Sequence, residues 1–465
     1  MLSFIKKLIP EDFFLRVWWH RLNGFIAAFV YGFPAKKLNI IGVTGTDGKS
    51  STVEFLVSIL EEKGFCVGVA STIRFQIGQK KWSNKTHKTT LGRFDLQRLL
   101  KRMSKEKCDI VILEASSHAL HQGRLIGVPF TSGVITNLSP EHLDFHKTME
   151  KYSHAKELLF KNVFKNKKKM EFETSLIVNI DDYYRDNFLR YKAEKNISYS
   201  YKKKKSSADL HLCASNVEPS FKNTKFTLNA NDHKIPISLK VLGDFNVYNA
   251  LAAAAVSINY IGDLNLKNLK IIKKGLESVK QVPGRMEIVD TEDRIAEKHG
   301  IKCMIDFGLT EKAMKSLYQT LRRIVTKGKI ISVFGSCGNR DTSKRPIIGE
   351  LAKDLTDVVI ICDDETYGEP LDKIRNEILS GIIVKLDEME ETREKNIEKS
   401  GLHKYCEKIH EIPNREMAIH YAIKKAQRGD VVIVTGMGDF DSRMLLGGEI
   451  PWNEREIIKQ GLRKL

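Results

Sequence analysis

The chain has 465 residues, 42% of them hydrophobic, which is enough for two or three domains with buried cores. Much of its net charge of +18 lies in lysine runs at 167–169 and 202–205, without interleaved aromatic residues, so a nucleic-acid groove is disfavoured and solvated loops or an anionic substrate remain. The seven scattered cysteines include no Cys-x-x-Cys pair, which excludes an obvious zinc ribbon and favours a reducing, cytoplasmic location.

We expect residues 1–37 to form a short helical segment. Within it, residues 4–33 are typical of one or two amphipathic helices that carry Trp18, Trp19 and Phe25. The apolar run at 25–33 is about half the ~20 residues that a spanning helix needs, and no signal peptide is evident. Packing on the next domain is the first interpretation of this segment, and a peripheral membrane contact is the second.

Residues 38–284 predict a first α/β domain of the phosphate-loop type, with a mostly parallel sheet. A strand at 38–43 leads into a glycine loop and a helix that Gly64 ends, and buried strands follow at 108–116 and 130–139. We expect 161–205 to be an irregular, lysine-rich excursion with one short strand. Period-two alternation over 208–242 indicates an antiparallel patch, and a helix at 246–262 closes the domain.

Pro and Gly within 281–290 mark an interdomain boundary, and residues 285–465 predict a second, Rossmann-like α/β domain. Its expected strands lie in the stretches 301–308, 329–339, 357–364 and 429–439, separated by helical segments.

The glycine loop after the first strand is a candidate phosphate site. Backbone N–H groups and a helix N-terminus hold phosphate oxygens, a lysine reaches the outer phosphates and a hydroxyl meets magnesium. The generic pattern has a glycine where this chain has Val43, so a tight turn with a surface lysine is the alternative. The candidate nucleotide-binding residues are Gly45, Thr46, Asp47, Gly48, Lys49, Ser50 and Ser51.

A magnesium nucleotide also needs acidic ligands at the carboxyl end of a neighbouring strand. Glu114 ends the strand "DIVILE" and is therefore a candidate ligand, or else it caps the following helix. Four histidines, His118, His121, His142 and His146, lie close together downstream and favour a site. Their spacing matches no familiar zinc quartet, so magnesium is the better prediction.

Several motifs follow one another along the chain: "GVTGTDGKSS", "TTLGRFDLQRLL", "LEASSHALHQGR", "ITNLSPEHLDFHKTMEKYSHAKELLF", "LGDFNVYNALAA", "VPGRMEIVD" and "FGSCGNRDTSKRP". Their order and spacing resemble those of Mur ligases, most closely the UDP-N-acetylmuramoyl-tripeptide synthetases, over roughly residues 38–460. The resemblance implies an ATP-dependent amide ligase of peptidoglycan precursor synthesis. Such an enzyme phosphorylates a muramoyl dipeptide, joins a free amino acid to the acyl phosphate, and releases ADP and phosphate.

The resemblance also implies a catalytic set. Lys49 would neutralise phosphate charge, Ser50 and Glu114 would ligate Mg²⁺, and His142 would hold a second ion. Lys156 matches the lysine that the family carbamylates to N6-carboxylysine, which becomes a further metal ligand. Without the resemblance, Lys156 is an ordinary helix-surface lysine.

Binding residues carry over position by position. Positions matching the muramoyl-peptide contacts are Thr89, Thr90, Ser116, Gln122 and Arg124. Positions matching the ATP contacts outside the loop are Asn246, Asn249, Arg285, Asp306, Asn339 and Arg340. Arg285 could instead pair across the linker. The resemblance implies that domain closure about Pro283 and Gly284 brings the last four residues onto ATP.

The departures from the family concern the substrates. Only 37 residues precede the first strand, so the N-terminal domain that grips UDP is missing; a partner subunit would replace it, or the acceptor would be lipid-linked. The family motif Asp-Asn-Pro-Arg reads "DDET", so Thr366 stands where an arginine would pair with diaminopimelate, and that substrate is disfavoured. Asp364 and Glu365 could bind the ammonium of lysine or ornithine, or form a solvated acidic turn.

Further departures are "DFGL" at 306–309 and "GMGDF" at 436–440, which lack the family's histidine, lysine and glutamate side chains. The alternative functions are a related ligase with a lipid-linked or other carboxylate acceptor, including a folylpolyglutamate-synthetase-like enzyme, and a non-catalytic nucleotide-binding paralogue. Retention of Glu114, His142 and Lys156 argues against the last of these.

Overall fold

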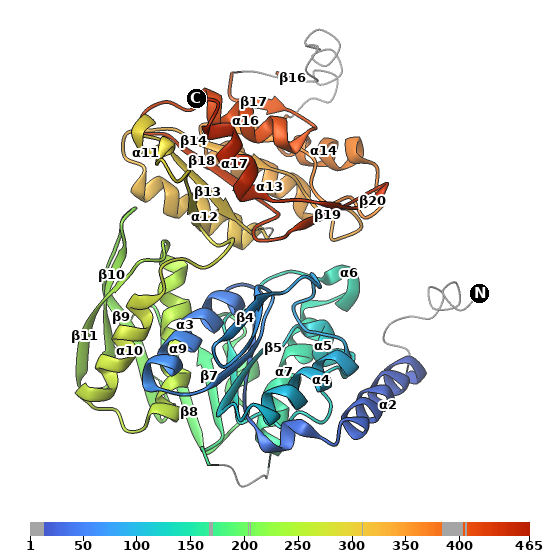
Figure 1. Ribbon diagram of the computed structural model, residues 1–465, viewed down its shortest axis with the longest axis vertical. Helices are drawn as coiled ribbons and strands as arrows, with labels where there is room; N and C mark the ends of the chain where they lie inside the picture. Colours follow the sequence, from blue (N-terminus) through green and yellow to red (C-terminus); the bar gives the residue numbers. More distant parts are fainter. Residues whose placement is uncertain are drawn as a thin grey trace. The chain divides into compact units, whose positions relative to one another are not determined.

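The computed structural model describes residues 14–166, 171–202, 204, 206–308, 310–383, 403–404 and 407–465 (Figure 1). Residues 4–13 of the predicted N-terminal helical segment lie outside this set. Two α/β units are present. Unit 1 contains residues 1–218, 223–240 and 244–280, and unit 2 contains 219–222, 241–243 and 281–465.

Unit 1 follows the predicted alternation of strands and helices. Its elements are α2 (Phe14–Val30), the 3-10 helix η1 (Pro34–Lys37), β1 (Asn39–Thr44), α3 (Lys49–Lys63), β2 (Val67–Ala70), β3 (Arg74–Ile77), β4 (Lys80–Ser83), α4 (Arg93–Lys105), β5 (Ile110–Glu114), α5 (Ser117–His121), β6 (Ser132–Ile135), α6 (Leu143–His146), α7 (Met149–Lys165), β7 (Ser175–Asn179), α8 (Arg185–Leu189), β8 (Lys195–Ser200), β9 (Leu210–Pro219), β10 (Thr224–Ala230), β11 (His233–Leu239), α9 (Asp244–Ile261) and α10 (Leu266–Ser278).

These strands form one sheet in the order β11-β10-β9-β8-β7-β6-β1-β5-β2-β3-β4. Pairing is parallel from β9 through β2 and antiparallel within β10–β11 and β2–β3–β4. The central strand β1 has β5 on one side and β6 on the other. The strand order therefore reverses at β1, and in open α/β sheets ligands bind beyond the carboxyl ends of the strands at such a point.

The segment 161–205 differs from the expected irregular excursion. It contains the end of α7 and also β7, α8 and β8, and both strands extend the parallel sheet. The polar residues of β8 concealed its burial in the sequence. Ser198 and Ser200 are fully buried, and their hydroxyls lie 2.8 and 3.1 Å from the two ring nitrogens of His211 on β9. These hydrogen bonds satisfy the hydroxyls and so allow them to be buried.

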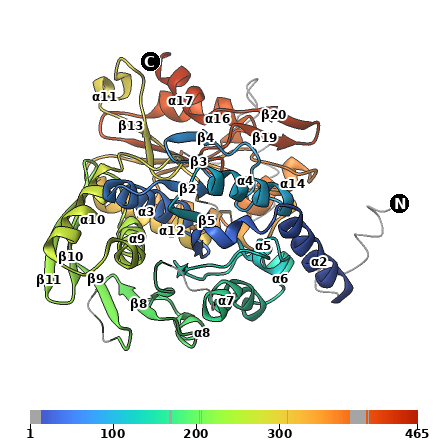
Figure 2. The same ribbon diagram turned by 60° about the horizontal axis from the view of Figure 1, so that its bottom comes forward.

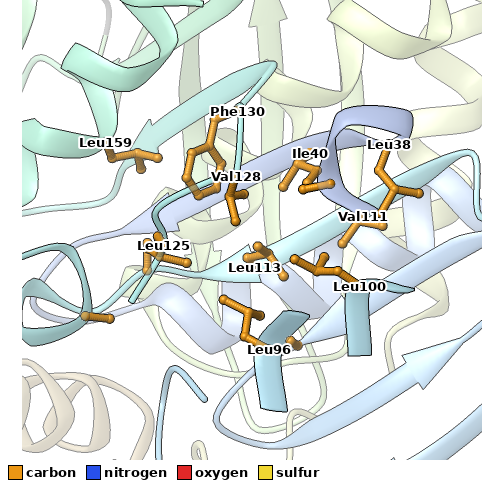
Figure 3. Close-up of a cluster of buried hydrophobic side chains, with 14 of the residues drawn as sticks. Leu38, Ile40, Leu96, Leu100, Val111, Leu113, Leu125, Val128, Phe130 and Leu159 are labelled. Carbon is orange, nitrogen blue, oxygen red and sulfur yellow. The ribbon is translucent and has the colours of Figure 1, made fainter. Parts of the chain in front are cut away.

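Helices cover both faces of the sheet. On one face, α3, α9 and α10 lie side by side (Figures 1 and 2). On the other, side chains of α4, α5 and α7 enter a core with alternate residues of the strands. Figure 3 shows part of this core: Leu38, Ile40, Leu96, Leu100, Val111, Leu113, Leu125, Val128, Phe130 and Leu159. Gly42 belongs to this face, because a Cβ there would lie 2.5 Å from Leu159 and 2.9 Å from Phe130.

Unit 2 is a second α/β unit. Its elements are β12 (Glu287–Val289), α11 (Ile295–His299), β13 (Lys302–Asp306), α12 (Glu311–Ile324), β14 (Ile330–Phe334), α13 (Lys344–Leu355), β15 (Val358–Ile361), α14 (Leu371–Leu379), β16 (His403–Lys404), β17 (Ile409–Glu411), α16 (Arg415–Lys425), β18 (Val431–Thr435), β19 (Ser442–Leu445), β20 (Gly448–Pro451) and α17 (Glu454–Leu462).

The main sheet of unit 2 has the order β12-β13-β18-β14-β15-β17-β16, with β13, β18, β14, β15 and β17 parallel. The four strands predicted from the sequence are β13, β14, β15 and β18, and they are confirmed. The short strands β12, β16 and β17 and the hairpin β19–β20 were not predicted. Among the helices that the structure describes, none has the length and apolar character that crossing a bilayer requires.

A buried ion pair joins α16 to α17 beside the carboxyl end of β18. The Arg415 guanidinium donates to Glu454 Oε1 from Nη2 at 2.6 Å and from Nε at 3.1 Å, and Nη2 also donates to the Thr435 carbonyl at 2.7 Å. Both side chains are at most 1% exposed. Burial raises the pKa of Glu454, opposed by the charge of Arg415, so the carboxylate depends on its partner.

We predict that Arg415→Met lowers the free energy of unfolding by about 3–5 kcal/mol, because it leaves an uncompensated buried carboxylate. Urea denaturation followed by circular dichroism measures the loss. The matched control is Arg463→Met, which breaks the exposed pair of Arg463 with Glu456 and should leave the midpoint unchanged. Equal midpoints for the two variants would contradict the prediction.

Candidate functional site

The loop between β1 and α3 lies against its neighbours at two glycines. Gly45 and Gly48 have φ of 147° and 82°, in the region that side chains disfavour. A Cβ on Gly45 would lie 1.8 Å from Thr136 Oγ1, and one on Gly48 would lie 2.2 Å from Asn249 Oδ1. Only glycine allows the loop to approach β6 and α9 this closely.

Hydrogen bonds from the residues after β6 fix the loop. Thr46 N donates to the Asn137 carbonyl at 2.9 Å, and Asp47 N donates to Asn137 Oδ1 at 3.0 Å. Thr136 Oγ1 donates to the Asp47 carbonyl at 2.6 Å. The loop is therefore held before any ligand binds, as a preorganised anion site requires.

Two lysine amines converge on one carbonyl of this loop. Lys49 Nζ donates to the carbonyls of Gly45 and Thr46 at 2.9 and 2.7 Å, and Lys156 Nζ donates to Gly45 O at 2.7 Å. Lys156 is 2% exposed, and burial, followed by the charge of Lys49, holds its pKa well below the usual value. The carboxylates of Glu141 and Asp47 oppose this shift without overcoming it. Lys156 is thus a buried amine whose charged form is disfavoured by its surroundings.

Glu114 stands at the carboxyl end of β5, beside the loop strand. It pairs in register with Val43 and is 1% exposed. Its two carboxylate oxygens accept hydrogen bonds from Thr72 N at 3.0 Å and Thr72 Oγ1 at 2.8 Å. The alternative that Glu114 caps the next helix is wrong, because Ser116 caps α5 through Ala119 N.

The four predicted histidines form one aromatic cluster. The His118 ring lies 4.7 Å from His142 and 5.4 Å from His146, and His121 lies 6.0 Å from His146. Burial, followed by the neighbouring charges of His118, His121 and Lys156, lowers the pKa of His146 to about 3, and its Nε2 lies 3.0 Å from Ser117 Oγ. His146 is therefore a neutral packing residue at pH 7.

His142 connects this cluster to the loop through Tyr152. The His142 and Tyr152 ring centroids are 6.3 Å apart, and Lys156 Nζ lies 4.5 Å from the Tyr152 ring centroid. The Tyr152 hydroxyl lies 3.2 Å from Thr46 Oγ1. Lys49, His142 and Lys156 are thus linked to the glycine loop by direct contacts or through one side chain.

The predicted metal ligands combine a hydroxyl, a carboxylate, an imidazole and a lysine. No three His, Cys, Asp or Glu side chains among the described residues form a group that could hold a metal ion. Ser50 and Glu114 supply the hard oxygen donors that Mg²⁺ prefers, at the loop and at the end of the adjacent strand. Their chemistry fits magnesium, and the set lacks a further anionic oxygen.

The residues predicted to contact the muramoyl peptide lie together at the same edge of the sheet. Thr90 Oγ1 donates to the Glu114 carbonyl at 2.8 Å and accepts from Ser116 N at 3.1 Å. Arg124 donates to Gln122 Oε1 from Nε at 3.0 Å and from Nη2 at 2.7 Å, and reaches the Thr90 carbonyl at 3.3 Å. Thr89 is half-buried next to them.

The predicted ATP contacts outside the loop are divided between the units. In unit 1, Asn249 Nδ2 donates to Asn246 Oδ1 at 2.9 Å, and Asn249 faces Gly48. In unit 2, the Asp306 carboxylate accepts from Met286 N at 2.8 Å and Gly308 N at 2.6 Å.

The remaining three ATP-side residues also belong to unit 2. Arg285 stacks 4.4 Å over the Phe307 ring and donates to the Gly284 carbonyl, and Arg340 lies 5.3 Å over the Tyr367 ring. Asn339 N donates to Glu369 Oε2 at 2.9 Å.

The segment Asp363–Thr366 is not the solvated acidic turn that was one of its two interpretations. Asp364, Glu365 and Thr366 are 2%, 5% and 0% exposed. Glu365 Oε2 accepts from the Tyr367 hydroxyl at 2.8 Å, while Asp364 Oδ2 is buried without a hydrogen-bond partner. A Cβ on Gly436 would lie 2.2 Å from that oxygen, so "DDET" faces the "TGMGD" turn after β18.

Sequence reasoning missed the residues that hold the site together. Thr72, Thr136, Asn137 and Tyr152 position Glu114, the loop and Lys156. The polar run "TNLSP" directly after the strand β6 could have indicated Thr136 and Asn137. Thr72 and Tyr152 carry no comparable signal, because their role depends on strand order and helix packing.

Comparisons with known proteins match both units. The family model described as "Mur ligase middle domain" matches residues 43–257, and "Mur ligase, glutamate ligase domain" matches 284–438. The UDP-N-acetylmuramoyl-L-alanyl-D-glutamate–2,6-diaminopimelate ligase of Clostridium tetani is 34% identical over 439 residues, covering 94% of this chain and 80% of that protein. The UDP-N-acetylmuramyl-tripeptide synthetase of Borreliella afzelii is 31% identical, covering 98% and 82%.

Solved structures resemble the chain as well. A structure titled as a UDP-N-acetylmuramoyl-L-alanyl-D-glutamate–2,6-diaminopimelate ligase is 27% identical, with a TM-score of 0.58, covering 92% of this chain and 78% of that one. The folylpolyglutamate synthase of Mycobacterium tuberculosis has a TM-score of 0.65 at 13% identity, covering 88% and 91%, and shares the fold.

We predict that Gly45→Ala weakens ATP binding by about tenfold or more, because the added methyl group displaces the loop from Thr136. Isothermal titration calorimetry with Mg-ATP measures the affinity. Gly64→Ala is the matched control: its φ of 100° imposes a similar backbone penalty, but a Cβ there meets nothing within 4 Å. Unchanged affinity for Gly45→Ala would show that the approach to Thr136 is irrelevant to the ligand.

Proposed function

This chain belongs to the Mur ligase family of ATP-dependent ligases, and from that premise we propose that it adds an amino acid to a muramoyl dipeptide, releasing ADP and phosphate. The observation that carries the proposal is the buried Lys156 amine on the Gly45 carbonyl, beside Lys49 of the phosphate loop. Since the reaction consumes ATP, we place it in the cytoplasm.

The proposed reaction has two steps. An oxygen of the acceptor carboxylate attacks the γ-phosphorus, the bond to the ADP oxygen breaks, and an acyl phosphate forms. The neutral amine of the amino acid then attacks the acyl carbon, and the tetrahedral intermediate expels phosphate while the nitrogen loses a proton. Both steps bring anions together, so the backbone N–H groups of the loop and the Lys49 ammonium stabilise the developing charge.

Magnesium is the metal that suits this site in the proposal. Ser50, Glu114 and His142 would hold it, and it would neutralise phosphate charge. Thr72 orients Glu114 for this role, because both carboxylate oxygens accept its hydrogen bonds. The peptide-site residues Thr90, Ser116, Gln122 and Arg124 would orient the acceptor next to Glu114.

Lys156 would supply the missing anionic oxygen as a carbamate. Its neutral amine attacks CO₂, an N–C bond forms, and one proton leaves, which converts the side chain to N6-carboxylysine. Burial and the lowered pKa support this reaction, because only an unprotonated amine is nucleophilic. The Nζ–H that the carbamate retains can still donate to the Gly45 carbonyl.

We propose that the amino acid is basic and lacks a second carboxylate. Thr366 cannot pair with a distal carboxylate as an arginine does, whereas Asp364 and Glu365 offer buried negative charge. The unpartnered Oδ2 of Asp364 supports an ammonium ligand, since an unsatisfied buried carboxylate oxygen is costly. Lysine and ornithine are the candidates.

The first test of the proposed function measures phosphate release that depends on both muramoyl dipeptide and amino acid. Lys156→Ala should reduce the rate about 100-fold, because it removes a metal ligand. Lys161→Ala, an exposed change on the same helix α7, should not change it. With ¹³C-bicarbonate, the wild type should show a carbamate carbon signal that Lys156→Ala lacks. A fully active Lys156→Ala variant would refute the assigned role.

The second test concerns the amino acid. Asp364→Asn should raise KM for lysine or ornithine about tenfold or more and leave KM for ATP unchanged, because one charge-assisted contact with the ammonium is lost. Initial-rate kinetics with each substrate varied in turn measure the two constants. Asp354→Asn, an exposed change in unit 2, is the control. A parallel rise in both constants would indicate a structural role for Asp364 instead.

A further inference from the structure

Helix α2 packs on unit 1 through a face of small residues. A Cβ on Gly24 would lie 2.4 Å from the Gly123 carbonyl, and Ala27 and Ala28 are completely buried. Arg93 Nε on α4 donates to the His20 carbonyl at 3.1 Å. Figures 1 and 2 both show α2 lying beside α4 at the periphery of this unit. The helix is thus firmly docked along one side.

The opposite side of α2 is apolar and exposed. Six large hydrophobic residues there are between 39% and 67% exposed: Trp18, Trp19, Phe25, Ile26, Phe29 and Val30. At about 100° per residue they fall on one continuous arc of about 140°. We call these six residues the outer face of α2. These residues form one contiguous apolar patch, whereas only exposed apolar residues that are scattered singly over a surface need no explanation.

The charged residues within the segment 14–37 are all basic. This segment contains no aspartate or glutamate, whereas Arg16 and Arg21 lie in the first half of α2 and Lys36 and Lys37 follow the helix; the acidic residues Glu11 and Asp12 precede the segment. The Phe33 ring packs edge-on against Phe25 and Phe29, with centroids 5.6 and 6.5 Å away, and Lys36 Nζ lies 4.7 Å over Phe33. The aromatic rings of Phe25, Phe29 and Phe33 therefore continue into the amine of Lys36.

We propose that the outer face of α2 docks on an anionic phospholipid surface as an interfacial helix. Trp and Phe side chains would enter the boundary between headgroups and acyl chains, while the exposed Arg21 and Lys37 extend their charges to lipid phosphates. A second copy of the chain is a poorer occupant, because two such faces would bring like charges together in a protein of net charge +18. The proposal concerns binding alone and does not depend on the reaction proposed above.

The test is co-sedimentation of the full chain with phospholipid vesicles. Vesicles of phosphatidylglycerol and phosphatidylcholine should bind the wild type, and phosphatidylcholine vesicles should bind it at least tenfold more weakly. Trp18→Ser/Trp19→Ser/Phe29→Ser should abolish binding, while the matched control Tyr183→Ser/Leu266→Ser, which removes exposed apolar side chains elsewhere on unit 1, should bind normally. Lipids brominated on the acyl chain should quench the tryptophan fluorescence of the wild type and of the control variant.

A charge series separates electrostatic attraction from apolar adsorption. Arg21→Gln and Lys37→Gln should each lower the partition coefficient about fivefold. Lys80→Gln and Lys161→Gln, which remove exposed charges elsewhere, should not.

Three results would overturn the proposal. They are equal binding to both vesicle types, binding that is unchanged in the triple variant, and no binding by the wild type. In the last case, sedimentation equilibrium would distinguish a dimer formed through the outer face from coverage by residues 1–13. Unchanged thermal midpoints would show that the variants are folded.

Discussion

The close approach of the glycine loop to β6 and α9 is the constraint on which the site depends. With no side chain at Gly45 and Gly48, the loop backbone lies directly against Thr136 and Asn249, and its carbonyls and amides occupy fixed positions. The Gly45 carbonyl then becomes the shared acceptor of Lys49 and Lys156. A looser loop would separate these amines, and the electrostatic relation between them would be lost.

That relation explains how one site contains two lysines with different roles. Lys49 is half-buried at the start of α3, directly after the loop, whereas Lys156 is a fully buried residue of α7. Enclosure penalises the charged form of Lys156, and the nearby ammonium of Lys49 penalises it again. The structure thus places beside the loop lysine a second amine whose charged form its surroundings disfavour, and the proposed modification of Lys156 rests on this difference.

Both units place their candidate site residues at the carboxyl ends of parallel strands, which is where ligands bind in open α/β sheets. In unit 1 the ends of β1, β5 and β6 supply the loop, Glu114 and its supporting residues. In unit 2 the ends of β13, β15 and β18 supply Asp306, Asp364 and Gly436. The apolar outer face of α2 differs from these sites in place and composition. It lies on a helix and not at the strand ends, and it consists of exposed, mostly aromatic residues with basic neighbours.

The sequence by itself determined the α/β class, the loop, the four core strands of unit 2 and most of the candidate residues. These features depend on local signals: glycines at a strand–helix junction, apolar runs of strand length, and an acid that ends such a run. Only the tertiary structure decided that β7 and β8 join the main sheet and that Asp364 is buried. It also decided that Lys156 is enclosed and that α2 turns its aromatic side outward. Burial and pairing of this kind arise between residues far apart in the chain, so no local pattern encodes them.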